Sequence, residues 1–92
     1  MRIQYTEKAA KQLKKIAKDN LQNAKLIVSK IEKYIDNPND TSNIKHLKGR
    51  YGDFLRLRVG DFRIIFDIEL QNMNIIEIKN RKDAYYDWYS NY

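Results

Sequence analysis

The stretch FLRLRVGDFRIIFDI, residues 54–68, decides which fold this chain is expected to adopt. It reads as two short strands joined by a turn at Gly60 and Asp61, because apolar and polar residues alternate on both sides of the turn. Successive side chains of a strand point to opposite faces of the sheet. One face of the hairpin is therefore apolar, and the opposite face gathers three arginines: Arg56, Arg58 and Arg63.

The segment upstream of this hairpin is expected to be helical. Residues 2–5 can form a first short strand, and Thr6 suits the N-cap of a helix that runs to about residue 19. A second helix is expected from about residue 21 to residue 35, since its apolar residues recur every three or four positions. Pro38 cannot continue that helix. The short linker between the helices predicts an antiparallel helix hairpin.

The rest of the chain is expected to complete a small sheet. Residues 39–52 read as a polar loop, and the polar, aromatic tail at 80–92 is compatible with a short C-terminal helix. Strands are expected at 53–59, 61–69 and 74–79. This pattern predicts one α+β domain over residues 1–92, with element order β-α-α-β-β-β. The helix hairpin would pack on one face of a twisted, mostly antiparallel sheet and leave the arginine face open.

The charge of the chain is unevenly distributed. The net charge is +6, and residues 1–34 carry nine lysines and arginines against three acids. Residues 44–63 carry six against two, whereas residues 64–92 carry three against five. A basic body of this kind suggests a polyanionic partner, and solubility alone is the competing explanation.

Several classes of protein are excluded by what the sequence lacks. With one histidine and no cysteine among 92 residues, neither a disulfide framework nor a metal site is expected. The three glycines, at 49, 52 and 60, fit no nucleotide-binding fingerprint, and no serine has the surroundings of a nucleophile triad, so no cofactor is expected. No leader peptide and no membrane-spanning segment is expected, which suits a cytoplasmic protein.

The residue types that remain for chemistry are arginine, lysine and tyrosine. An arginine presents a planar fork of donors that fits a phosphate group bidentately. A tyrosine can stack on a nucleic-acid base, and its phenol can transfer a proton when its pKa is lowered. These groups suit cleavage of an RNA backbone without a metal, in which the RNA's own 2′-hydroxyl attacks the adjacent phosphate. The same groups also suit RNA binding without cleavage.

Three segments together resemble the RelE/ParE superfamily of bacterial and archaeal toxins from toxin–antitoxin systems. They are YTEKAAKQLKKI (5–16), IKHLKGRYGDFLRLRVGDFRIIFDI (44–68) and IEIKNRKDAYY (76–86), in that order and spacing. The resemblance implies a helix hairpin on a twisted, mostly antiparallel sheet. It also implies one of two activities: RelE-like members cleave mRNA in the ribosomal A site without a metal, whereas ParE-like members poison DNA gyrase. Both kinds are silenced by a cognate antitoxin.

The same resemblance implies roles for individual residues. Arg63 matches the arginine that stabilises the scissile phosphate, and Arg56 and Arg58 match a basic pair on the preceding strand. Arg81 matches an arginine that follows the last strand, and Tyr85 matches a tyrosine that stacks on the mRNA base or assists proton transfer. The expected catalytic residues are Arg56, Arg63, Arg81 and Tyr85. Residues expected to contact RNA or phosphate around them are Lys45, Lys48, Arg50, Arg58 and Tyr86.

Two positions depart from the family pattern. Asn80 stands where many members have a histidine, and Phe54 stands where some RelE-type toxins have a lysine. Both departures remove a group that could transfer a proton. They are compatible with a slow enzyme, with an enzyme that relies on the ribosome for acid–base help, and with an inactive homologue.

Three functions follow as hypotheses. The first is a ribosome-dependent mRNA endoribonuclease of the RelE type, whose partners are the 30S A site and mRNA. The second is a gyrase inhibitor of the ParE type without nuclease activity. The third is a homologue that only binds: it is either held by its antitoxin or acts as a component of an autoregulatory complex that contacts operator DNA through the antitoxin. A cognate antitoxin is the expected partner in all three, and no membrane contact is expected.

Overall fold

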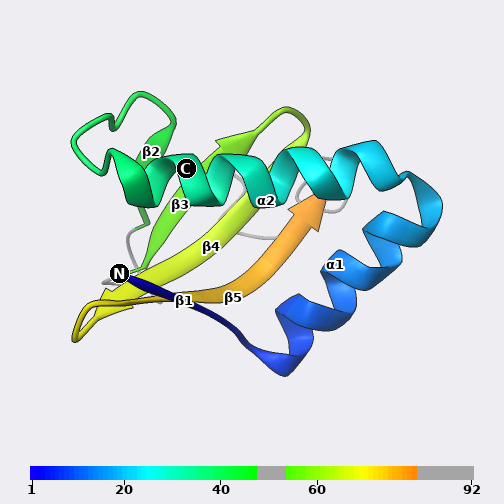
Figure 1. The fold of residues 1–92 in the computed structure, drawn as a ribbon, viewed down its shortest axis with the longest axis horizontal. Helices are drawn as coiled ribbons and strands as arrows, with labels where there is room; N and C mark the ends of the chain where they lie inside the picture. Colours follow the sequence, from blue (N-terminus) through cyan, green and yellow to red (C-terminus); the bar gives the residue numbers. More distant parts are fainter. Residues whose placement is uncertain (48–53, 81–92) are drawn as a thin grey trace.

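The helical segment begins where its sequence indicates. In the computed structural model, which describes residues 1–47 and 54–80, Thr6 is the N-cap of α1 (Glu7–Asp19), and its hydroxyl oxygen accepts a hydrogen bond from the first turn. Asn20 follows α1 and is also the N-cap of α2 (Leu21–Asp36), where its side chain accepts from two backbone N–H groups. Because one residue joins them, the two helices diverge directly from Asn20 (Figure 1).

The end of α2 follows from Pro38. The helix stops at Asp36, one residue beyond the expected end, and Asn37 is its C-cap. A proline disfavours helical backbone at the residue before it, so Asn37 leaves the helical conformation with φ −142° and ψ 72°. The chain then turns back toward the sheet, where a short strand begins at Ile44.

The sheet contains five strands and covers one side of both helices (Figure 1). Its spatial order is β1-β5-β4-β3-β2, in which β1 pairs with β5 in parallel and all other pairs are antiparallel. The strands are β1 (Arg2–Tyr5), β2 (Ile44–His46), β3 (Leu55–Val59), β4 (Phe62–Glu69) and β5 (Asn72–Asn80). The α+β fold and the mostly antiparallel sheet expected from the sequence are confirmed.

Two elements differ from the sequence-based expectation. The segment 39–52 was expected to be loop throughout, yet Ile44–His46 forms strand β2 at the edge of the sheet. That strand depends on backbone pairing with β3, which three residues cannot signal through side-chain alternation. Strand β5 also begins at Asn72 rather than at 74, because the turn before it is confined to Leu70 and Gln71. The short C-terminal helix expected in the tail lies outside the described residues.

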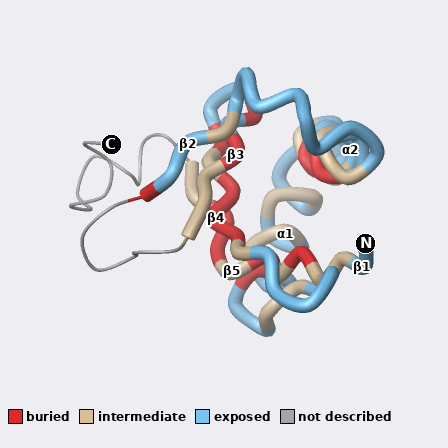
Figure 2. Tube along the Cα trace, turned by 90° about the vertical axis from the view of Figure 1, so that its left-hand side faces the viewer, coloured by how far each residue is buried: buried red, intermediate tan, exposed pale blue. Residues whose placement is uncertain are grey.

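The core lies between the helices and the apolar face of the sheet. Figure 2 shows buried backbone along the central strands, with α1 and α2 on one side of them. The sheet contributes the fully buried residues Phe66, Ile64 and Ile75 to this core. Helix α2 contributes Ile27 and Ile31 to the same cluster. Full burial of such a side chain contributes about 1.5–3 kcal/mol. The alternation in 54–68 therefore determines which sheet face the helices cover.

The turn in the central hairpin uses the freedom of Gly60. Val59 pairs with Phe62, so Gly60 and Asp61 form a two-residue loop between β3 and β4. Gly60 has φ +57°, a conformation that costs an L-residue roughly 1–2 kcal/mol. This tight turn holds β3 and β4 in the register that places their arginines opposite one another.

Candidate functional site

Three cations lie side by side across the sheet face that the helices leave uncovered. Arg58 on β3 is paired with Arg63 on β4, and Arg63 is paired with Lys79 on β5. Residues directly opposite each other on neighbouring strands point to the same face. We call Arg58, Arg63 and Lys79 the cationic row.

A second row of side chains lies next to the cationic row on the same face. Lys45 on β2 is paired with Arg56 on β3, which is paired in turn with Ile65 on β4. Ile65 is paired with Glu77 on β5. The basic face consists of the cationic row together with Lys45 and Arg56. Four strands position it, so its geometry depends on the register of most of the sheet.

The arginines of the basic face are close enough to repel one another. Burial lowers the pKa of the Arg56 guanidinium, and the charges of Arg63 and Arg58 lower it further. The Arg56 guanidinium remains protonated even so, because the ordinary pKa of an arginine lies far above neutral pH. The folded sheet therefore holds these positive charges close together, and a bound anion would reduce the repulsion between them.

The Arg63 guanidinium has a buried donor that is unsatisfied by residues 1–47 and 54–80. Its Nη1 atom is buried and has no hydrogen-bond partner, and neither Arg63 nor Arg58 forms an ion pair within residues 1–47 and 54–80. Asp67, an acid two positions beyond Ile65, instead accepts a 2.8 Å hydrogen bond from the Asn74 side chain. A buried donor without a partner is costly, so an arginine in this state suits a site that receives an acceptor from a ligand.

An apolar cluster adjoins the cations on the same face. Leu47 and Ile65 are 1% exposed, and Phe54 and Ile76 pack against them. Of these four residues, Ile65 on β4 belongs to the second row, and Ile76 on β5 lies next to the register shift between Ile65 and Phe66. The basic face is therefore bordered by a small, buried apolar cluster, which packs this side of the sheet next to the cations.

The residues expected from the sequence divide into two groups. Arg56, Arg58, Arg63 and Lys45 are brought together on the basic face. The remaining expected residues lie outside the described part of the chain: Lys48, Arg50, Arg81, Tyr85 and Tyr86. Their roles stay predictions.

Lys79 was missed by the sequence reasoning. Its side chain is 17% exposed and lies opposite Arg63. A signal was present, because Lys79 follows the core residue Ile78 and must therefore point to the arginine face under strand alternation. What the sequence alone could not reveal is that β5 is the strand next to β4 at that position.

A second concave feature lies between the helices, away from the basic face. It is a groove of about 600 Å³ whose walls come mainly from α1 and α2. Leu13, Leu21 and Val28 supply apolar surface, and Lys14 and Lys25 also line the groove. Its shape and composition suit an apolar segment with acidic residues at its margins.

Neither a metal-binding cluster nor a membrane-spanning helix is found among the described residues. They contain no group of three or more histidine, cysteine, aspartate or glutamate side chains that could hold a metal ion. None of the helices they form has the length and hydropathy needed to cross a membrane.

Solved structures that are similar to this fold include toxins and toxin–antitoxin complexes. The YoeB/ParE toxin from Agrobacterium tumefaciens has a TM-score of 0.76 at 14% identity, over 87% of this chain and 98% of that chain. The YoeB–YefM complex from Staphylococcus aureus has a TM-score of 0.70 at 18% identity, over 86% and 94%. The archaeal RelE–RelB complex from Pyrococcus horikoshii has a TM-score of 0.68 at 21% identity, over 87% and 93%. At such identities the likeness establishes the fold.

The family itself is established by the sequence as a whole. No curated protein sequence matches the chain. A family model described as the ParE toxin of the type II toxin–antitoxin system parDE matches residues 3–85, which span both helices and the whole sheet except the first residue of β1. The chain therefore belongs to the ParE toxin family of type II toxin–antitoxin systems.

Proposed function

We propose that this toxin is a ribosome-dependent, metal-independent endoribonuclease that cleaves mRNA in the ribosomal A site and so inhibits translation. The activity is that of the RelE-like branch which the sequence resembles. The observation that carries the proposal is the basic face, and above all the buried Nη1 atom of Arg63 that has no partner among the described residues. A phosphate oxygen is the acceptor that such a donor fits best.

The reaction follows from the chemistry of RNA. The 2′-hydroxyl loses its proton and attacks the adjacent phosphorus, the bond from phosphorus to the 5′-oxygen breaks, and the leaving oxygen takes up a proton. The products are a 2′,3′-cyclic phosphate and a 5′-hydroxyl. Negative charge grows on the phosphate oxygens in the transition state, and fixed cations stabilise it most where water is excluded. Arg63, Arg56 and Arg81 would carry this role, and Tyr85 would stack on or orient the base.

The surrounding cations would hold the flanking nucleotides. Lys45 is exposed on the edge strand β2 and lies opposite Arg56, so it extends the basic face beyond the reacting phosphate. Arg58 extends it along the cationic row. We propose that Lys48, Arg50 and Tyr86 also contact the RNA. The ribosome would present the mRNA in a bent, single-stranded form, which exposes one phosphate to the face.

We assign the groove between α1 and α2 to the cognate antitoxin. The solved YoeB–YefM and RelE–RelB complexes are assemblies of relatives of this fold with their antitoxins. The groove offers apolar surface next to Lys14 and Lys25, and the chain carries a net charge of +6. An amphipathic helix with acidic residues beside its apolar stripe would complement both properties.

A second function has one observation in its favour. The matching family model bears the name of the ParE toxin. The resemblance of the sequence to the RelE/ParE superfamily implies gyrase inhibition by protein contact as the activity of ParE-like members. A gyrase inhibitor of that kind has no need of an arginine row with an unpartnered buried donor. The endoribonuclease therefore accounts for more of the structure.

The deciding experiment uses a purified translation system with a defined mRNA, with and without ribosomes. Cut sites are mapped by primer extension for the wild type, for Arg63→Ala, and for Arg2→Ala as a matched control. Arg2 is exposed and pairs with Asn72, at the opposite end of β5 from Lys79. Loss of one transition-state donor lowers such rates by about 10²–10³. We therefore expect A-site cuts that require ribosomes, a loss of this size in Arg63→Ala, and wild-type cutting in Arg2→Ala.

Two results would redirect the proposal. Growth arrest without mRNA cuts, accompanied by loss of plasmid supercoiling by gyrase, would replace the endoribonuclease with the gyrase inhibitor. Absence of both activities, with a folded protein, would leave a homologue that acts only through binding.

A further inference from the structure

Glu77 is an acid placed among the cations on the sheet face opposite the helices. It is 7% exposed, and it is the one charged or polar residue that is buried within the described ranges. Its strand partner is Ile65, and two positions along β5 is Lys79, so Glu77 and Lys79 point to the same face. A buried carboxylate needs compensation, and the structure provides it from two sides.

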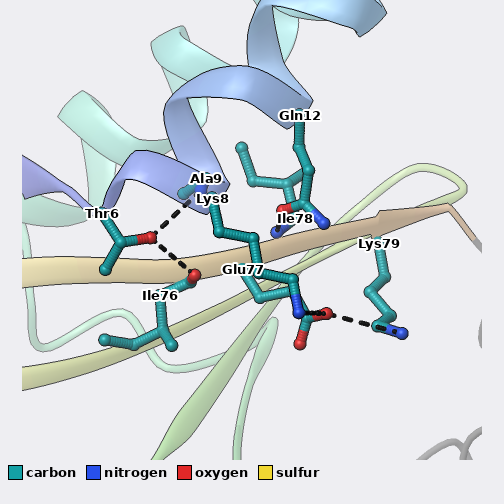
Figure 3. A network of polar contacts seen from close by, with 8 residues as sticks. All are labelled: Thr6, Lys8, Ala9, Gln12, Ile76, Glu77, Ile78 and Lys79. Carbon is teal, nitrogen blue, oxygen red and sulfur yellow. Dashed lines mark hydrogen bonds and ion pairs between the residues drawn. The ribbon is translucent and has the colours of Figure 1, made fainter.

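Two lysines share the Glu77 carboxylate. The Lys8 Nζ atom lies 2.9 Å from Glu77 Oε1, and the Lys79 Nζ atom lies 3.5 Å from the same oxygen (Figure 3). The Lys8 side chain is 64% exposed, whereas that of Lys79 is only 17% exposed. The three groups together carry one positive charge. Lys8 thus offsets the carboxylate from the outer edge, and Lys79 remains a net positive contribution to the cationic row.

The approach of Lys8 depends on how α1 is attached to the edge of β5. Strand β1 pairs with β5 only as far as Ile75. Beyond Ile75, side chains of α1 and of its N-cap form hydrogen bonds with the β5 backbone. The Thr6 hydroxyl donates to the Ile76 carbonyl at 2.8 Å, and the Gln12 side-chain oxygen accepts from the Ile78 N–H at 2.7 Å (Figure 3). These bonds fix the first turns of α1 against β5, and Lys8 reaches Glu77 from there.

We infer that Lys79 is a further phosphate-contacting residue of the basic face and that Glu77 is a positioning residue that holds the Lys79 ammonium beside Arg63. The inference rests on the proposed function, since it assigns a new residue to the same RNA site. Lysine provides a compact point charge on a flexible stem, and such a charge is useful only when something holds it in place. The 3.5 Å contact with Glu77 restrains the Lys79 ammonium, and the 2.9 Å contact with Lys8 offsets the carboxylate charge.

The test measures how binding of a fluorescent single-stranded RNA oligonucleotide to the full chain depends on salt. For single strands, the slope of log K against log salt changes by about 0.7 for each phosphate contact. Lys79→Gln should reduce the slope by about 0.7, and Lys79→Arg should restore it. Lys8→Gln is the matched control, because it removes the same charge from the same carboxylate but on the outer edge. It should reduce the slope by less than Lys79→Gln does, because it leaves the Lys79 ammonium on the cationic row.

Glu77→Gln separates positioning from simple charge. This variant raises the net charge by one, so a purely electrostatic effect would strengthen binding and leave the slope unchanged or larger. If Glu77 positions Lys79, the slope falls to the Lys79→Gln value instead. Circular dichroism melting curves for all four variants exclude loss of the fold as the cause.

The outcomes decide this inference separately from the proposed function. Equal slopes for Lys79→Gln and Lys8→Gln would overturn the role of Lys79, and so would a wild type that binds no RNA. A wild-type slope in Glu77→Gln would overturn the positioning role. A wild type that binds RNA with the expected variant slopes but never cuts mRNA would leave Lys79 in the site and remove the endoribonuclease.

Discussion

Arg58 and Arg63 lie directly opposite each other on neighbouring antiparallel strands, and neither forms an ion pair in the described part of the chain. Like charges in such a cross-strand position destabilise a sheet, where a well-matched pair would contribute roughly 0.2–1 kcal/mol. Lys79 extends the unfavourable row on the other side of Arg63. A sheet built for stability would not keep this arrangement, so we interpret it as a cost of binding a polyanion.

Replacement of Arg58 should therefore stabilise the protein while weakening its activity. Arg58→Thr places a β-branched residue at an exposed strand position and removes the repulsion with Arg63, which should raise the free energy of unfolding by about 0.2–1 kcal/mol. Urea unfolding followed by circular dichroism measures this change. Arg58→Lys keeps the charge and should leave stability near the wild-type value. A less stable Arg58→Thr would show that Arg58 supports the fold rather than a ligand.

Substitutions in the groove between α1 and α2 should separate antitoxin binding from toxicity. Leu21 is 55% exposed and lines the groove, whereas Leu26 is 44% exposed on the same helix and lies outside it. Leu21→Glu places an acid in the first turn of α2, where the helix dipole favours it, so the fold should be unaffected. We expect Leu21→Glu to weaken neutralisation by the antitoxin at least tenfold and to leave toxicity intact. Titration of growth arrest by co-expressed antitoxin measures this effect.

The matched variant for the groove is Leu26→Glu, which changes exposure and charge in the same way outside the groove. It should be neutralised as the wild type is. Equal neutralisation of both variants would move the antitoxin away from the groove and toward the basic face.

The turn between β4 and β5 should be open to improvement. Leu70 and Gln71 have φ of 50° and 66°, which is the backbone of a type I′ turn. Neither residue favours this conformation, and the Leu70 side chain is 89% exposed, so little burial is lost by replacing it. The double variant Leu70→Asn, Gln71→Gly should raise the free energy of unfolding by about 1–2 kcal/mol. An unchanged melting temperature would contradict this reading of the turn.

The attachment of α1 to the sheet edge should depend on Gln12. Its side-chain oxygen accepts the hydrogen bond of the Ile78 N–H, and Ile78 is 3% exposed. Gln12→Met keeps the volume but leaves that donor without a partner, which should cost about 1–3 kcal/mol of stability. Gln12→Glu retains an acceptor and should recover most of the loss. Chemical denaturation of the three proteins tests the difference, and equal stability of the Met and Glu variants would refute it.

The stability of the protein should fall at alkaline pH in part through Tyr5. Burial raises the pKa of the Tyr5 phenol, and the nearby Glu32 carboxylate raises it further. Because the folded-state pKa lies above the unfolded value of about 10, this contribution is complete below pH 10 and is lost as the pH rises through the folded-state pKa. Between pH 9 and pH 11, Tyr5→Phe should lose less stability than the wild type. Burial also raises the pKa of Tyr34, so some pH dependence should persist in the variant.

Much of the fold was open to prediction because its signals are local. Thr6 marks the start of α1, Pro38 limits α2, and the alternation in 54–68 separates a core face from an arginine face. Each signal involves residues within one turn or one strand. The order of strands in the sheet has no such local signal, because β1 and β5 are neighbours in the sheet but lie at opposite ends of the sequence.

In the candidate site, too, some features follow from local sequence signals and others depend on the order of the strands. The sequence predicts that Arg56, Arg58 and Arg63 share one face, because each alternates with apolar residues that form the core face of its own strand. The positions of Lys79 next to Arg63 and of Lys8, from a helix, beside Glu77 depend on the tertiary structure. Strand neighbours are chosen by backbone hydrogen bonds and by packing against the helices, and those bonds are common to every residue type. The alternation of a sequence therefore tells which way a side chain points, and the assembled sheet decides which side chain it meets.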